Sequence, residues 1–99
     1  MIVGICKIAL YLPACHSLKD KRSILRKIKD KFFSRFKIML SEVDDLDLWQ
    51  RASLGFAVVA SDKKLVEGIV EKAINFIDLK DGAEIIDRAV EFINFKKQP

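Results

Sequence analysis

Four basic side chains, Lys19, Arg22, Arg26 and Lys29, follow one another at intervals of three, four and three residues. At 100° per residue, this spacing places them along one side of a helix. Lys and Arg side chains in such a row pair with the phosphates of a nucleic-acid backbone, so the spacing favours RNA binding. Phe33 continues the same spacing and adds an aromatic ring, which can pack or stack beside the phosphate contacts.

These cations belong to a strongly basic segment, residues 17–37. The segment holds nine of the 18 Lys and Arg residues beside only Asp20 and Asp30, a local charge of +7 on a protein whose total is +4. An asymmetry of this kind favours a polyanionic partner. The alternative is an ordinary solvated helix face, because Lys and Arg are good helix formers. An acidic protein or a membrane surface is a third interpretation.

Cys15 and His16 directly precede the basic segment and are the residues that most resemble reactive chemistry. A thiol near a helix N-terminus and a cationic neighbour can have a lowered pKa, but no third group that would orient the pair is evident. Loop residues are therefore the simpler interpretation. Two Cys and one His are too few for a zinc site. A calcium loop would need regular spacing and a turn glycine, and both are missing around Glu42, Asp44, Asp45 and Asp47. We expect no catalytic residue, no metal and no cofactor.

The single Trp, Trp49, stands next to Gln50 and Arg51 at the entrance to an apolar stretch. A Trp in this position either anchors an interface or locks a loop to the core. We expect Trp49, together with Tyr11 near the end of the first strand, to act as an interface anchor. Arg51 is expected to add one cation to the phosphate contacts.

Hydrophobic periodicity predicts the elements that position these residues. Strands are expected over residues 2–12, 37–43, 52–60 and 83–95. A helix begins at Ser17, where an S-x-x-D pattern with Asp20 favours an N-terminus, and runs through the basic segment. A second helix, capped by Ser61 or Asp62, runs from about Lys63 to Asp78. The expected core stripe of the first helix is Leu18, Ile24, Leu25, Ile28, Phe32 and Phe36, and that of the second is Leu65, Ile69, Val70, Ala73, Ile74 and Ile77.

The element order is β-α-β-β-α-β. Right-handed crossovers then give a four-stranded antiparallel sheet in the order 4-1-3-2 with both helices on one face, which is an α+β ferredoxin-like sandwich. The helix-free face would carry apolar side chains from the first strand, namely Val3, Ile5, Ala9 and Tyr11. We therefore expect a homodimer, formed through this face or through an edge strand such as residues 83–95.

Composition fits one domain over residues 1–99, since 51% of the residues are hydrophobic and 32% are charged. No apolar run approaches the roughly 18 residues that span a bilayer, and the N-terminus lacks the order of a signal peptide. We expect a cytoplasmic protein with reduced thiols and no membrane contact.

Three separated motifs together resemble one family. They are Ser17–Leu18–Lys19–Asp20–Lys21–Arg22, Ser41–Glu42–Val43, and Asp47–Leu48–Trp49–Gln50–Arg51–Ala52 with Leu54–Gly55. In this order they are similar to the YlxP-like family, also called domain of unknown function 503. The resemblance implies a small bacterial cytosolic protein with a ferredoxin-like fold and no established activity. It also implies genes near translation and ribosome-maturation factors, and hence RNA or ribosome contact by context.

The sequence therefore favours a non-enzymatic RNA- or ribosome-associated module. In this hypothesis, Lys19, Arg22, Arg26, Lys29 and Arg51 contact phosphates and Phe33 packs at the margin. The alternative is a homodimeric protein-interaction or assembly domain without a nucleic-acid role, anchored by Trp49.

Overall fold

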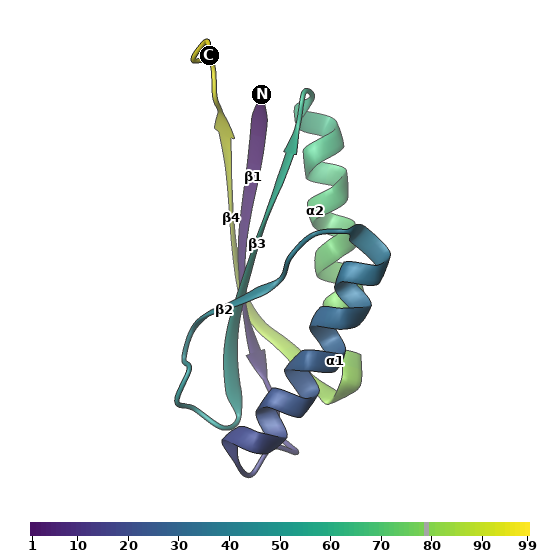
Figure 1. Cartoon of the computed structure of the whole chain (residues 1–99), viewed down its shortest axis with the longest axis vertical. Helices are drawn as coiled ribbons and strands as arrows, with labels where there is room; N and C mark the ends of the chain where they lie inside the picture. Colours follow the sequence, from purple (N-terminus) through teal and green to yellow (C-terminus); the bar gives the residue numbers. More distant parts are fainter. Residues whose placement is uncertain (79) are drawn as a thin grey trace.

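The computed structural model of the chain describes residues 1–78 and 80–99. The order of elements is β1 (Ile2–Tyr11), α1 (Leu18–Phe36), β2 (Ser41–Asp44), β3 (Arg51–Ala60), α2 (Lys63–Ile77) and β4 (Glu84–Asn94), with a short 3-10 turn η1 (Lys80–Gly82) before β4. The strands form one antiparallel sheet in the order β2-β3-β1-β4, and both helices lie on the same face of it (Figure 1). The predicted α+β ferredoxin-like fold and its strand order are confirmed.

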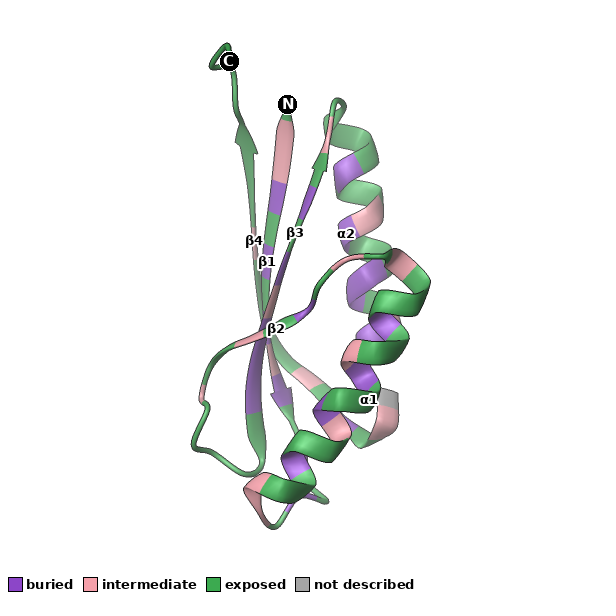
Figure 2. Ribbon diagram, in the orientation of Figure 1, coloured by how far each residue is buried: buried purple, intermediate pink, exposed green. Residues whose placement is uncertain are grey.

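The core lies between the two central strands and the helices. β1 and β3 pair along their whole length, from Ile2 opposite Ala60 to Tyr11 opposite Arg51. Alternate residues of each strand therefore point toward the helices, as the period of two requires. The buried residues on this face are Gly4, Cys6, Ile8 and Leu10 from β1 and Ala52, Leu54, Phe56 and Val58 from β3. Figure 2 shows the buried positions of both helices facing this side of the sheet.

Helix α1 begins and ends at defined caps. The Ser17 hydroxyl accepts a hydrogen bond from the Asp20 backbone N–H at 3.0 Å, which is the predicted start. Lys37 ends the helix in the left-handed region, with φ of 58°, and donates its backbone N–H to Phe33 O at 2.8 Å. Because the chain turns at Lys37, residues 38–40 lead from the helix to the sheet, and β2 starts at Ser41. The predicted strand over residues 37–43 was therefore placed too early.

Helix α2 buries a stripe that differs in one residue from the expected one. Its buried residues are Val66, Val70, Ala73, Ile74 and Ile77, while Ile69 is half-buried. Leu65 is 53% exposed, so its assignment to the core was wrong. Val66 lies four residues before Val70 and faces the sheet, whereas Leu65 points about 100° away from Val66 on the helix.

Glycine at position 4 lets α2 approach β1 closely. A Cβ at Gly4 would lie 2.6 Å from Val66 Cγ1 and 3.2 Å from Val70 Cγ2. Both valines are buried, so neither can move away freely. By contrast, a Cβ at Gly68 in the middle of α2 would meet nothing within 4 Å. These two glycines therefore have opposite consequences for stability.

We predict that Gly4→Ala lowers the free energy of unfolding by about 1–3 kcal/mol through overpacking. Gly68→Ala should raise it by about 0.5–1 kcal/mol, because alanine is the better helix former in open space. Urea unfolding followed by circular dichroism measures both changes. If the loss is caused by the Val66 contact, Gly4→Ala should cost less in a Val66→Ala background than in the wild type. Equal effects of the two glycine substitutions would contradict this account.

Candidate nucleic-acid interface

The basic ridge, defined as Lys19, Arg22, Arg26 and Lys29, lies along one flank of α1. Lys19, Arg22 and Arg26 are exposed, and Lys29 is half-buried. None of the four forms an ion pair with another described residue, although five such pairs occur elsewhere in the part of the chain that the structure describes. The spacing predicted one row of cations, and the helix places them in that row with their charges available to a ligand.

The ridge occupies the flank of α1 that faces β2 rather than α2. On the opposite flank, Lys31 pairs with Asp81 at 2.9 Å, just after α2. At the C-terminal end of the ridge, Lys29 and Phe33 line a hollow together with Lys37, Met39 and Leu40, which lead into β2. Phe33 is 47% exposed there, and the Lys37 ammonium lies 5.7 Å from the centre of its ring. The row of cations thus ends in the exposed ring of Phe33, as the spacing predicted, beside a hollow that also includes Asp30 and Ser34.

Lys21 belongs to the same basic segment but lies inside the protein. Only 2% of it is exposed, and its Nζ lies 2.8 Å from Glu42 Oε2. The ammonium also donates to the carbonyl oxygens of Asp45 and Leu48, both at 2.8 Å. Glu42 Oε2 is itself buried and has no hydrogen bond of good geometry. The ion pair with Lys21 therefore offsets the cost of burying this charged oxygen. Lys21 therefore ties α1 to β2 and to the loop that follows it.

Sequence reasoning did not single out Lys21, although its position carried a signal. Lys21 lies four residues before Leu25 and seven before Ile28, so it falls on the apolar arc of α1. A basic residue on that arc must either extend its charge to the surface or find buried partners. The acid on β2 and the loop carbonyls are those partners here.

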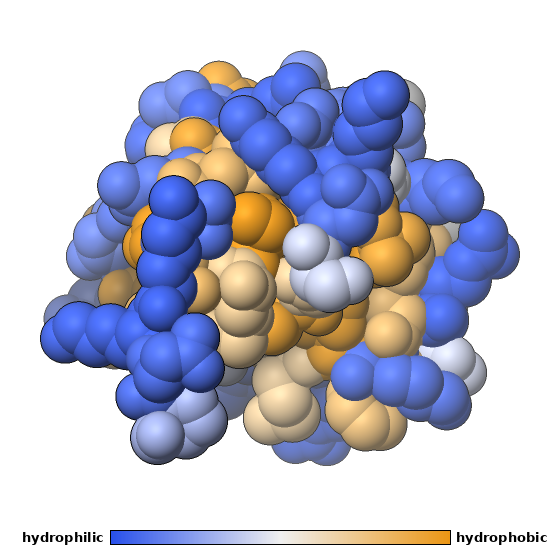
Figure 3. Space-filling model, turned by 90° about the horizontal axis from the view of Figure 1, so that it is seen from above, coloured by the Kyte–Doolittle hydropathy of each residue, from blue (hydrophilic) through white to orange (hydrophobic). Residues whose placement is uncertain are grey.

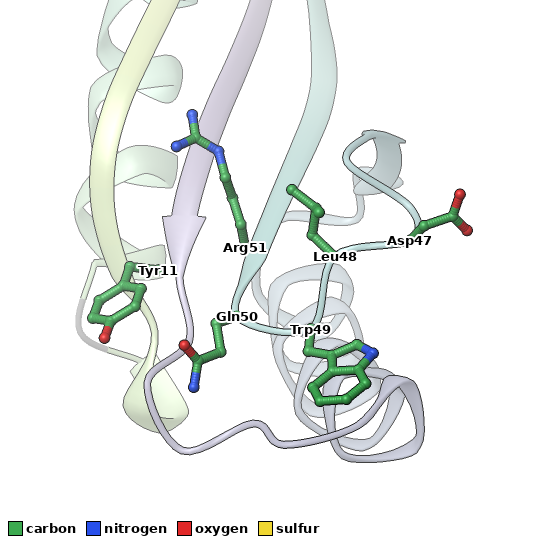
Figure 4. Close-up of a pocket in the computed structure, with 6 residues that line it drawn as sticks. All are labelled: Tyr11, Asp47, Leu48, Trp49, Gln50 and Arg51. Atoms are coloured by element: carbon green, nitrogen blue, oxygen red, sulfur yellow. The ribbon is translucent and has the colours of Figure 1, made fainter.

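Trp49 and Tyr11 come together at the end of the molecule where β1 ends and β3 begins. They line one shallow pocket with Asp47, Leu48, Gln50 and Arg51 (Figure 4). Trp49 is 53% exposed and Tyr11 is 39% exposed. The Gln50 amide donates to the carbonyl oxygens of Pro13 and Cys15, and Gln50 O accepts from Leu12 N, so the backbone beneath Trp49 is held firmly. The two predicted anchors therefore share one exposed apolar site on a fixed backbone.

Arg51 lies on the other face of the sheet from the basic ridge. It is opposite Tyr11 in the register, and its neighbour Ala52 faces the helices. The Arg51 guanidinium pairs with Asp45 Oδ2 at 3.3 Å, and the same oxygen accepts from Ser53 Oγ at 2.7 Å. The structure therefore does not bring Arg51 to the ridge.

Acids of the 44–47 loop also have basic partners on this helix-free face. Lys7 Nζ lies 3.0 Å from Asp44 Oδ2, and this hydrogen bond lowers the pKa of the Asp44 carboxyl. Together with the Arg51–Asp45 pair, it shows that two of the loop's acids have an electrostatic role within the fold. Within the described residues, no group of three His, Cys, Asp or Glu side chains is arranged to hold a metal ion.

Cys15 is enclosed rather than presented at the surface. Burial raises the pKa of its thiol above the usual 9.0, and the nearby Asp20 carboxylate acts in the same direction. Burial also raises the pKa of the Cys6 thiol to about 11. Both thiols are buried, and this burial disfavours the thiolate form. Reactive cysteines are partly exposed and have a lowered pKa, so the surroundings of Cys15 differ from theirs.

The geometry defines a class of protein: a small ferredoxin-like α+β domain with a row of free cations along one helix. Residues 3–90 match the family described as "Protein of unknown function (DUF503)", and the chain belongs to this family. It is also similar to a protein named "Uncharacterized protein YlxP" from Bacillus subtilis (strain 168). The two are 31% identical over 77 residues, which cover 78% of this chain and 84% of the relative. The resemblance found in the motifs is therefore confirmed. Among the described residues, no helix is both long and apolar enough to cross a membrane.

We predict that Lys21→Met lowers the free energy of unfolding by about 3–5 kcal/mol, because it leaves the buried Oε2 of the half-buried Glu42 carboxylate without its cation. The double substitution Lys21→Met with Glu42→Leu should recover much of this loss, since it removes both buried charges. Lys27→Met, on the exposed side of the same helix, is the matched control and should change stability by less than about 0.5 kcal/mol. Urea unfolding measures all three, and equal losses for Lys21→Met and Lys27→Met would contradict the assigned role.

Proposed function

We propose that the chain is a cytoplasmic, non-enzymatic RNA- or ribosome-associated module that binds phosphates along the basic ridge. The observation that carries the proposal is the set of four cations on one flank of α1, none paired with a described acid. Structural cations in this protein behave differently: Lys7, Lys21, Lys31, Arg51 and Arg88 all have carboxylate partners. The fold therefore does not use the ridge charges for internal pairing.

The surroundings of the ridge support a nucleic-acid ligand in particular. Phe33 at its end offers an exposed ring, and Met39, which lines the same hollow, is 73% exposed. An aromatic ring beside a row of cations combines stacking with phosphate pairing, as single-stranded nucleic-acid sites do. Because the Lys37 ammonium already lies over the Phe33 ring, a base that stacks there would replace a cation–π contact with a ring–ring contact. This arrangement suits RNA of little sequence preference better than a protein partner with a defined acidic surface.

We expect binding to RNA to weaken steeply with salt. If each ridge cation neutralises one phosphate, log K should fall against log salt with a slope of about −3 for a single strand and about −4 for a duplex. Converting the ridge to Glu at positions 19, 22, 26 and 29 should abolish most of the affinity for a fluorescent single-stranded RNA. The matched control changes Lys27, Lys64, Lys72 and Lys96 to Glu, which gives the same net charge but alters exposed cations away from the ridge. Fluorescence anisotropy measures both.

The same two variants test whether RNA binding in cells depends on the ridge. Crosslinking followed by identification of the bound RNA and protein should recover RNA with the wild type and the control, but not with the ridge variant. If the ridge variant loses no RNA species, or if both charge-changed variants lose binding equally, the ridge is not the site.

A homodimeric protein-interaction or assembly domain is the alternative. It is supported by the apolar side chains that the sheet exposes on its helix-free face, where Ile5 is 40%, Val59 58% and Ile93 40% exposed. Figure 3 looks along the molecule from the end that carries both termini and shows an apolar area framed by polar side chains. The pocket with Trp49 and Tyr11 lies at the opposite end of β1 and supplies a second apolar site.

Trp49→Ala separates the two functions. If a protein partner uses Trp49 as an anchor, this substitution should weaken the complex by at least about tenfold, since buried Trp anchors commonly contribute about 2 kcal/mol or more. The ridge-to-Glu variant should then leave that complex intact. Affinity capture with quantitative mass spectrometry compares the two variants, and Phe95→Ala, another exposed aromatic residue, is the control. A partner that is lost with the ridge variant but kept with Trp49→Ala would contradict the alternative.

A further inference from the structure

Strand β4 is a long edge strand that the rest of the fold leaves uncovered. It has 11 residues, pairs with β1 on one side only, and includes no fully buried residue. Figure 2 shows it almost entirely exposed, in contrast to β3 at the centre of the sheet. Its apolar side chains are accessible, with Ile86 46%, Phe92 37% and Ile93 40% exposed. A long exposed edge strand presents unpaired N–H and C=O groups on which another strand can pair.

The register shows which backbone groups of β4 are free. Met1 and Phe95 exchange both backbone hydrogen bonds, at 3.2 and 2.8 Å, so they form a hydrogen-bonded pair of the β1–β4 ladder. Such pairs alternate with pairs that make no bonds to each other. Counting back from Phe95, the N–H and C=O groups of Arg88, Val90, Phe92 and Asn94 therefore point outward. These four residues present a ready edge for another strand.

The side chains of these outward-pointing residues line a groove beside α2. Arg88, Val90 and Phe92 border it together with Glu67 and Glu71 of the helix. The Arg88 guanidinium is held by Glu71 at 3.2 Å, and the Lys63 ammonium lies 5.6 Å from the centre of the Phe92 ring. The groove thus contains a cation at one end, an aromatic ring at the other and Val90 between them. When two such strands run antiparallel, the cation of each strand lies opposite the aromatic ring of the other.

We propose that a second copy of this chain pairs antiparallel with β4 about a two-fold axis at Val90, giving a continuous eight-stranded sheet. In this register Val90 lies opposite Val90 of the other copy, and each Arg88 lies opposite Phe92 of the other copy, where a guanidinium can contact a ring. On the other face, Glu91 lies opposite Ala89. The outward N–H and C=O groups of both copies then bond to each other. This inference rests on the homodimer of the alternative above and assigns its interface.

Charge disfavours the three registers with their axis at Arg88, Ala89 or Glu91. An axis at Arg88 places two Arg88 side chains opposite each other, and an axis at Glu91 does the same for two Glu91 side chains. An axis at Ala89 places Asp87 opposite Glu91 twice. Like charges directly opposite in a sheet are destabilising, so the axis at Val90 is selected among these four. The irregular pairing with β1 between Ala9 and Leu10 distorts β4 beyond Asp87 and limits further pairing there.

Engineered cysteines test the register between the two copies of β4, because a disulfide forms only between residues that lie opposite each other. In the proposed dimer, residues 89 and 91 of the two copies are a pair without mutual hydrogen bonds, whose Cα atoms lie about 4.5 Å apart, within the range of a disulfide. The chain with Ala89→Cys and Glu91→Cys should therefore form a covalent dimer on mild oxidation, seen on a non-reducing gel. Asp87→Cys with Glu91→Cys, which reports the axis at Ala89, is the matched control and should remain monomeric on the gel, as should the wild type.

Removing one outward N–H tests the interface without disturbing the fold. Val90→Pro deletes a donor that the β1 ladder does not use, and proline is tolerated at such edge positions. Sedimentation equilibrium should give twice the 11.3 kDa chain mass for the wild type and for Val90→Ala, and the single-chain mass for Val90→Pro. Circular dichroism of Val90→Pro checks that the fold is retained. If Val90→Pro does not fold, disulfide formation in the two double-cysteine variants tests the β4 interface without it.

The outcomes separate this inference from the proposals on which it builds. A wild type of single-chain mass at all concentrations would overturn the homodimer and this interface together, and would leave RNA binding by the ridge untouched. A dimer that persists in Val90→Pro and gives no disulfide between positions 89 and 91 would overturn the β4 interface alone, and would favour pairing through the helix-free face. Loss of RNA binding in the ridge variant with an unchanged dimer mass would support both sites as independent.

Discussion

The β2 side of this protein depends on one buried cation. β2 is only four residues long and pairs with β3 through three residue pairs, so its own ladder holds it weakly. Lys21 compensates by reaching from α1 to the Glu42 carboxylate and to two loop carbonyls. Each partner alone would be costly to bury, but together they satisfy one another. The Lys21 contact therefore joins α1, which carries the ridge on its flank, to β2 and to the loop that follows it.

The fold was predictable because its local signals agree with one another. The period of two in β1 and β3, the S-x-x-D start of α1 and the turn residues before β4 all indicate the same β-α-β-β-α-β order. Errors occurred where the local signal was ambiguous. Leu65 and Val66 are adjacent apolar residues. Leu65 keeps the helical spacing of Ile69, whereas Val66 keeps that of Val70, Ala73 and Ile77 and packs beside Gly4. The start of β2 depends on the left-handed conformation of Lys37, which a lysine rarely adopts.

The candidate site was predictable in part. Spacing along a helix fixes a row of side chains, so the amino-acid sequence alone is enough to place the ridge and Phe33 on one flank of α1. The positions of two other cations depend on tertiary contacts. Lys21 resembles its basic neighbours in sequence, and its burial follows from an acid on a strand 21 residues later. Arg51 was expected in the loop before β3, but it is the first residue of that strand, and strand alternation directs it away from the ridge.

The strand order determines what length of RNA could contact both ridges of a dimer. β2 and β4 are the two edges of the sheet, so the ridge near β2 lies as far as possible from the β4 edge. Joining two copies at β4 would leave both ridges on the same face, beside β2 strands that lie about seven strand spacings apart, roughly 34 Å along the sheet. An RNA shorter than this distance would reach one ridge only, whereas a longer strand would gain the second at high effective concentration. The positions of β2 and β4 at opposite edges of the sheet would thus make the affinity depend on the length of the RNA.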